Sequence, residues 1–209
     1  FDAVVGGRSV GTPGTVKLLW ETHKKLGNNS WKKLLTPAIE LATKGFAVSP
    51  RLSNAVKRDQ KNLTRDNSSA EYFFPNGKAV ESGHILKNIE YAQTLSLLAE
   101  KGGDHFYQKP ISQAIVDKVK SSSNPGYLKQ EDFDAYRVIE RPAICSNYRR
   151  YEICGMGPPS SGAITVSQTL GILSFFELTE RSPNDAETWH LIGEASRLAF
   201  SDRGLYIAD

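Results

Sequence analysis

The 209-residue sequence lacks any run of apolar residues that approaches the roughly 20 a bilayer-spanning helix needs, and no signal-peptide pattern opens it. It also lacks a large excess of charge, since 26 lysines and arginines stand against 23 aspartates and glutamates. With 39% hydrophobic residues, it does not have the composition of a disordered chain. A transmembrane helix and intrinsic disorder are therefore excluded. The length is sufficient for one globular domain with a hydrophobic core.

The chain also lacks an initiator methionine and begins at Phe1, so we expect it to be part of a larger or processed polypeptide. The small cationic excess is spread along the sequence, with the pairs Lys24–Lys25 and Lys32–Lys33 on expected helices. Basic residues do not alternate with aromatic ones, as they do in proteins that bind single-stranded nucleic acid. We therefore expect solvated helical faces and no nucleic-acid partner.

Hydrophobic periodicity and capping residues predict an α+β chain, mostly helical with one antiparallel hairpin. The expected helices are 16–26, 31–44, 49–63, 88–101, 110–120, 128–136, 162–176 and 185–206, and the hairpin is 137–156. Pro37 predicts a kink or a restart at Thr36, and residues 64–82 are expected to be irregular and mobile. No linker is long enough to separate domains. Because a lone hairpin is marginally stable, its strands should belong to a larger sheet, whose other strands could lie outside this chain.

The sequence has only two cysteines, and both lie in the hairpin. If a two-residue turn is centred on Tyr148 and Arg149, Cys145 lies diagonally from Cys154, roughly 7–8 Å away. That distance is too long for a disulfide. Pairing Tyr148 with Tyr151 instead would place the two cysteines opposite each other. We favour two buried free thiols, with the disulfide as the alternative.

The segment from Gly155 to Ser160 stands between a strand and a helix, as a dinucleotide-binding loop does. Its two prolines lack the backbone donors that bind a pyrophosphate, and Ser160 replaces the third glycine, so we expect no cofactor. Ser160 or Ser161 could be a nucleophile on a sharp turn, but neither has glycine both two residues before and two after it. A helix N-cap, whose serine oxygen accepts a backbone N–H, is favoured. The exposed helix start could also line an anion-accepting wall.

Two further groups of residues could carry chemistry. Asp132 and Asp134 lie near the start of a short helix. A favourable interaction of their carboxylates with the helix dipole explains these residues better than a role as an acid–base pair. His190 and Glu194 lie four residues apart on a helix and could bind a metal, but a third ligand at a suitable spacing is absent. We therefore expect no metal site and find no complete catalytic set.

Blocks of residues along nearly the whole chain occur in an order typical of one family. These blocks are Gly11 to Val16, Pro37 to Ala42, Gly45 to Ser49, Leu128 to Tyr136, Tyr148 to Ile153, Pro158 to Gly162 and Glu194 to Arg203. They resemble the large subunit of the γ-glutamyltranspeptidase family. The departures are Gly157, where a third proline is usual, and Ala163, where a second glycine is usual.

The resemblance implies an N-terminal-nucleophile hydrolase fold, a four-layer αββα sandwich, made from a precursor that cuts itself. It implies γ-glutamyl transfer from glutathione and related donors to water, amino acids or peptides. In the family, the nucleophile is a threonine at the start of the small subunit, which is its own base through its α-amine. An arginine ahead of this chain's first residue binds the donor carboxylate. Both positions lie outside Phe1 to Asp209.

We therefore expect residues 1–209 to be a single segment of the large subunit, incomplete at both ends. We assign it no catalytic residue, substrate-binding residue or metal ligand, and we expect the segment alone to be inactive. Its expected partner is the small subunit of a heterodimer, and the expected location is periplasmic or secreted. The alternatives are a cephalosporin or glutaryl acylase of the same fold, and a non-catalytic helical binding module.

Overall fold

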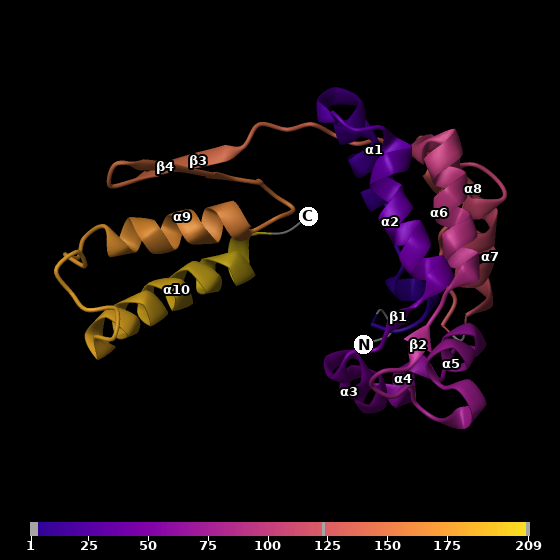
Figure 1. The fold of residues 1–209 in the computed structure, drawn as a ribbon. Helices are drawn as coiled ribbons and strands as arrows, with labels where there is room; N and C mark the ends of the chain where they lie inside the picture. The colour runs from indigo at the N-terminus through magenta and orange to yellow at the C-terminus, as the bar shows by residue number, and fades with distance from the viewer. Residues whose placement is uncertain (1–3, 123, 208–209) are drawn as a thin grey trace. The chain divides into compact units, whose positions relative to one another are not determined.

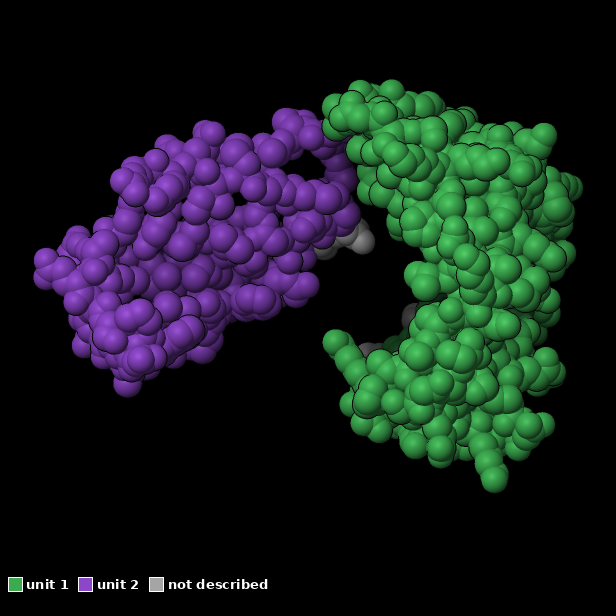
Figure 2. Space-filling model, viewed as in Figure 1, with its two compact units in different colours: residues 1–138 green, residues 139–209 purple. Residues whose placement is uncertain are grey.

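The computed structural model describes residues 4–122 and 124–207 and divides the chain into two compact units, 1–138 and 139–209 (Figure 2). The two units are joined by residues 136–143, which lie in no helix or strand. The sequence shows no long linker. This short segment nevertheless lies between the contacts within the first unit and those within the second. None of the helices in the described ranges combines the length and the apolar character that crossing a membrane requires.

Unit 1 is built from helices, two short strands and three short 3-10 helices (Figure 1). Its elements are η1 (Gly7–Ser9), α1 (Thr15–Leu26), α2 (Trp31–Lys44), β1 (Phe46–Ala47), α3 (Pro50–Arg58), α4 (Gln60–Leu63), α5 (Asn67–Phe73), η2 (Pro75–Gly77), β2 (Ile85–Leu86), α6 (Ile89–Lys101), η3 (Gly103–Tyr107), α7 (Ile111–Ser121) and α8 (Gln130–Ala135). The strands β1 and β2 pair antiparallel.

Unit 2 consists of a hairpin and two helices (Figure 1). Its elements are β3 (Ile144–Tyr148), β4 (Tyr151–Gly155), α9 (Gly162–Leu173) and α10 (Ala186–Tyr206). Helix α9 packs on the hairpin, and α10 packs on α9. The expected fold class, mostly helical with an antiparallel hairpin, is confirmed. Within the described residues, however, each sheet has two strands, so the larger sheet expected from the sequence is absent from them.

The expected helix starts are confirmed where a polar side chain accepts a backbone N–H. The hydroxyl of Ser30 accepts from Lys33 at the start of α2, and the side-chain oxygen of Asn88 accepts from Tyr91 at 2.9 Å in α6. Helix α2 runs through Pro37, so the expected restart at Thr36 is wrong. Packing of α2 along α6 outweighs the hydrogen bond that the proline cannot donate.

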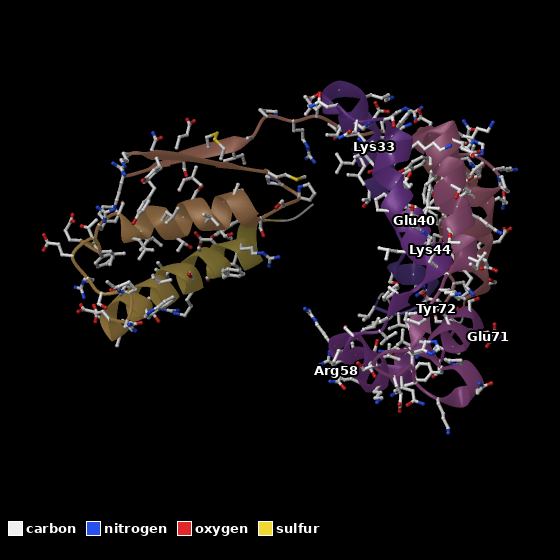
Figure 3. The ribbon with its side chains drawn as sticks, viewed as in Figure 1. Lys33, Glu40, Lys44, Arg58, Glu71 and Tyr72 are labelled. Atoms are coloured by element: carbon white, nitrogen blue, oxygen red, sulfur yellow. A yellow bond between two sulfur atoms is a disulfide. The ribbon has the colours of Figure 1, made fainter. Side chains whose placement is uncertain are left out.

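The surface of α2 carries opposite charges one turn apart. The ammonium of Lys44 lies 3.0 Å from a carboxylate oxygen of Glu40 (Figure 3). Both side chains are well exposed, at 73% and 55%. The pair therefore contributes at most a few tenths of a kcal/mol, about 0.3–0.5, to the stability of the helix.

The expectation that residues 64–82 are irregular is wrong for α5 and η2, which this segment contains, whereas 64–66 and 78–82 lie in no helix or strand. The carboxylate of Asp66 accepts the N–H of Ser69 at 3.1 Å and starts α5, and the segment sends Phe74 and Val80 into a core at 6% and 2% exposure. That core also holds Val48, Val56 and Leu86. Side chains from α3, from β2 and from residues 74 and 80 thus share one core.

A second core of unit 1 lies between η3, α7 and α8. Its buried members are Tyr107, Val116, Val119, Leu128 and Phe133. Phe133 is only 1% exposed and is the largest fully buried side chain of the described residues. This ring therefore joins α8 to the rest of the unit.

Replacing Phe133 with alanine should lower the free energy of unfolding of unit 1 by about 3–5 kcal/mol, because a buried aromatic ring is lost and a cavity is left. Urea unfolding followed by circular dichroism measures the change. Leu26→Ala is the matched control, since Leu26 is 76% exposed and should cost less than about 0.5 kcal/mol. If Phe133→Ala lowered the free energy of unfolding as little as Leu26→Ala does, the packing described here would be contradicted.

Polar contacts anchor the start of α1 to η3. The Tyr107 hydroxyl donates to the carbonyl of Pro13 at 2.6 Å and accepts the N–H of Lys17 at 3.1 Å. The carboxylate of Asp104 accepts the indole N–H of Trp20 at 2.9 Å and also pairs with the ammonium of Lys17. The hydrogen bond from Lys17 is the main cause that lowers the pKa of Asp104, and Trp20 adds to it.

This network predicts a pH-dependent contribution to stability. Because the folded pKa of Asp104 is lowered, its contribution is present above the unfolded pKa of about 3.9 and is lost as pH falls through the lower folded pKa. The difference in unfolding free energy between the wild type and Asp104→Asn should therefore be present at neutral pH and vanish in acid. Glu81→Gln, at an exposed site outside the network, should show no such dependence. A difference that persists in strong acid would count against the ion pair.

Candidate functional site

The turn formed by residues 156–161 connects β4 to α9 and is the region that sequence analysis singled out. The guanidinium of Arg141 donates to the carbonyl of Pro158 at 2.6 Å. The N–H of Ser160 donates to the carbonyl of Gly157 at 3.1 Å. The hydroxyl of Ser160 accepts the N–H of Gly162 at 3.3 Å. The expected bond from a backbone N–H to a serine oxygen is thus confirmed for Ser160.

Ser161 precedes the first residue of α9, but its side chain makes no capping hydrogen bond. Its hydroxyl instead accepts from the Nε of Arg203 at 2.8 Å, across 42 positions of sequence. The Arg203 guanidinium also lies 5.9 Å from the centre of the Phe200 ring. Ser161 therefore occupies the expected N-cap position, but the expected capping hydrogen bond to its side chain is absent, and its hydroxyl accepts from the charged donor Arg203 instead.

A second contact joins the same two helices. The side-chain amide of Gln168 on α9 donates to the carboxylate of Asp202 on α10 at 2.9 Å. Both residues line a cavity of about 500 Å³ whose other walls include Ile172, Phe175 and Leu198. The blocks that contain Ser161 and Arg203 therefore meet at one end of the α9–α10 pair. Sequence analysis missed Arg141 and Gln168, because no spacing signal marks contacts this distant in the chain.

The hairpin corrects the expectation about the cysteines. Tyr148 pairs with Tyr151, and Cys145 therefore lies opposite Cys154, with a disulfide between them and a Cα–Cα distance of 4.1 Å. The two-residue turn contains Arg149 and Arg150, one position later than the turn we favoured. Arg149 adopts a left-handed conformation with φ 53° there. The favoured prediction of two buried free thiols is wrong, since both cysteines are bonded and exposed.

The remaining candidate residues have separate partners. Asp132 accepts the N–H of Lys129 at 3.0 Å where α8 begins, and Asp134 accepts from Gln130. Glu194 accepts two hydrogen bonds from Arg197, and this hydrogen bonding, together with the positive charge of Arg197, lowers the pKa of Glu194.

Within the described ranges, one group of three metal-capable side chains has its ligand atoms close together. This group is Cys145, Glu152 and Cys154. The disulfide removes both thiolates as ligands. The arrangement therefore offers no cation site while the disulfide is intact.

The chain was compared with known proteins, and the family model of γ-glutamyltranspeptidase matches residues 1–209. This chain belongs to that family. It is 35% identical over 206 residues to an acylase ACY 1 proenzyme of Pseudomonas sp. (strain SE83), with 99% of this chain and 37% of that protein covered. It is 34% identical over 208 residues to a glutathione hydrolase proenzyme of Bacillus subtilis (strain 168), with 100% and 35% covered.

A solved structure agrees with this membership. The chain is similar to the γ-glutamyltranspeptidase of Helicobacter pylori with a TM-score of 0.93 and 31% identity, covering 99% of this chain and 59% of that one. The likeness confirms that the chain is part of the expected N-terminal-nucleophile hydrolase fold. The chain spans about a third of the length of the curated relatives it matches.

Replacing Arg203 with methionine should speed amide exchange at residues 160–163 by roughly two- to fivefold, because one hydrogen bond to Ser161 is lost while an unbranched apolar stem is kept. Hydrogen–deuterium exchange with mass spectrometry measures this. Arg197→Met is the control, since Arg197 donates to Glu194 on its own helix. Equal exchange in the two variants would mean that Arg203 does not hold the turn.

Proposed function

We propose that this chain is a segment of the large subunit of a γ-glutamyltransferase/hydrolase, incomplete at both ends. The family match over residues 1–209 is the observation that carries the proposal. The fold likeness to the Helicobacter pylori enzyme supports it.

The complete protein would cleave the γ-glutamyl bond of glutathione and related donors and pass the acyl group to water, an amino acid or a peptide. The relatives named proenzymes support a precursor that is cut into two subunits. The small subunit would carry the threonine nucleophile, with its α-amine as the base. This chain would supply no reacting group and would need no cofactor, and its role would be to scaffold the site.

The surface of unit 2 supports a scaffold that packs against further chain. Helix α10 exposes Trp189 at 62% and Phe200 at 61%, and Phe175 beyond the end of α9 is 86% exposed. A helix that is apolar on more than one side is typical of a buried position. Among the described residues, no further strand pairs with either outer edge of the hairpin, and additional strands could cover these edges.

The disulfide between Cys145 and Cys154 supports a periplasmic or secreted location. Such bonds form and persist in oxidising compartments and are rare in the cytosol. We therefore propose that the complete protein is periplasmic or secreted.

An acylase of the same fold is the second candidate. The similarity to the Pseudomonas acylase favours it, as does a TM-score of 0.84 at 30% identity to a cephalosporin acylase of Bacillus halodurans. A non-catalytic helical binding module has no comparable support.

Assays of the full-length gene product separate these candidates. Hydrolysis of a chromogenic γ-glutamyl anilide, with little turnover of a glutaryl amide, is the expected result. The reverse preference would favour the acylase. Turnover of neither compound by correctly processed protein would favour the binding module.

The purified 209-residue chain should show no γ-glutamyl turnover in the same assay, because the nucleophile and the donor-binding arginine are expected outside it. Full-length protein at equal concentration is the positive control. If the turnover persisted after the chain was purified further, the proposed scaffold role would be overturned.

A further inference from the structure

Helix α9 covers one face of the β3–β4 hairpin. Ser146 donates to a serine hydroxyl of α9 at 2.8 Å, so its side chain points toward that helix. Because side chains alternate along a strand, Cys145, Asn147, Glu152 and Cys154 lie on the opposite face. We call these four residues the inner face of the hairpin.

The fold determines what packs on the inner face. In an αββα sandwich, the helices form the two outer layers and the two sheets pack against each other. Since α9 occupies one side of the hairpin, the inner face is the side that meets the second sheet. Among the described residues of unit 2, the hairpin is the only sheet, and the chain spans about a third of its relatives' length. We therefore expect the strands of the second sheet outside unit 2.

The inner face carries a full negative charge. The carboxylate oxygen of Glu152 lies within 4.8 Å of both sulfurs of the disulfide. Its cross-strand neighbour is Asn147. Within the described part of the chain, no ion pair or side-chain hydrogen bond reaches the Glu152 carboxylate.

The three arginines in and beside the hairpin are engaged by other acceptors. Arg149 donates to a backbone carbonyl beyond the end of α9 at 3.1 Å. Arg150 donates to the hydroxyl of Tyr151 at 3.0 Å. Arg141 donates to the carbonyl of Pro158 at 2.6 Å. A compensating charge for Glu152 therefore has to come from another part of the protein.

A carboxylate that is covered by a second sheet loses its water and needs other partners. Buried charges in proteins are paired with an opposite charge or coordinate a metal. The disulfide removes the two thiolates that would complete a metal site beside Glu152. The amide of Asn147 is neutral and does not compensate a full charge. A basic side chain is therefore the partner that the inner face fits.

We propose that a lysine or arginine of the second sheet pairs with Glu152, and that this ion pair fixes the position at which that sheet packs on the hairpin. A shift of the second sheet by one residue would move the base to the other face of its own strand and leave both charges unpaired. The disulfide supports the pair, because it joins the two strands two residues from Glu152. The inference rests on the fold and the hairpin geometry and not on the proposed reaction.

The first experiment is a crystal structure of the full-length protein. We expect a lysine or arginine nitrogen within about 4 Å of a Glu152 carboxylate oxygen, on a strand that packs against the inner face. A Glu152 side chain that faces solvent, or that is held by neutral donors alone, would overturn the proposal.

A double-mutant cycle then tests whether the two charges act as a pair. The variants of the full-length protein are Glu152→Gln, the partner base changed to methionine, and both changes together. The readout is the rate of thermal unfolding, followed by tryptophan fluorescence. Glu152→Gln alone should raise this rate on the order of tenfold, because it leaves a buried base without its counter-charge.

The double variant should unfold more slowly than Glu152→Gln, since neither charge is then left alone. The control cycle replaces the partner with a second base of the same sheet that the crystal structure places away from Glu152, and its two effects should multiply. Effects that also multiply in the first cycle would show two independent charges and overturn the pairing.

Exchanging the charges tests whether the pair fixes the packing. Glu152→Lys places two positive charges together and should abolish most of the yield of folded protein, measured by size-exclusion chromatography. Changing the partner base to glutamate in the same protein should restore that yield, whereas the same change at the control base should not. A variant that fails to fold is the starting point of this test, because recovery is what is measured. Equal yields from the two double variants would overturn the role in packing.

Discussion

The register of the β3–β4 hairpin is the constraint on which the rest of unit 2 depends. Because side chains alternate, a shift by one residue would move every side chain to the opposite face. In the observed register, Ser146 and its partner Ile153 face α9, and Cys145 and Cys154 meet on the other face. The contact with α9, the disulfide and the entry to the turn 156–161 therefore all follow from the pairing of Tyr148 with Tyr151.

Two of the blocks that carry the family resemblance, Pro158 to Gly162 and Glu194 to Arg203, also meet in space. Ser161 comes from the first block and Arg203 from the second, and their hydrogen bond ties the start of α9 to the end of α10. The hydrogen bond from Gln168 to Asp202 joins the same two helices about two turns further along α9. A contact of this kind needs both side chains, so the residues in these blocks have a structural reason to occur together.

The sequence predicts those features that are decided within a few residues. Ser49 followed by Pro50 predicts the start of α3, since an N-cap and a first-turn proline act locally. Residues 64–82 have a polar composition, and the burial of Phe74 and Val80 depends on elements distant in sequence. The prediction of the hairpin register was wrong for a similar reason. The position of the two-residue turn decides the register, and a turn at 148–149 and one at 149–150 both suit the local sequence. The contacts of Arg141 and Gln168 in the candidate site had no local signal.

A chain without a reacting group can still influence a reaction, because groups that react must be held within about 0.5 Å of a productive geometry. The turn 156–161 has no regular structure, yet Arg141, Arg203 and the disulfide constrain it from different elements. Each polar contact is exposed and therefore weak alone. Together they limit the turn far more than its own sequence could, since two prolines remove backbone donors from it. Such constraint on a loop is what a scaffold contributes, and it supports the scaffold role that we propose for this chain.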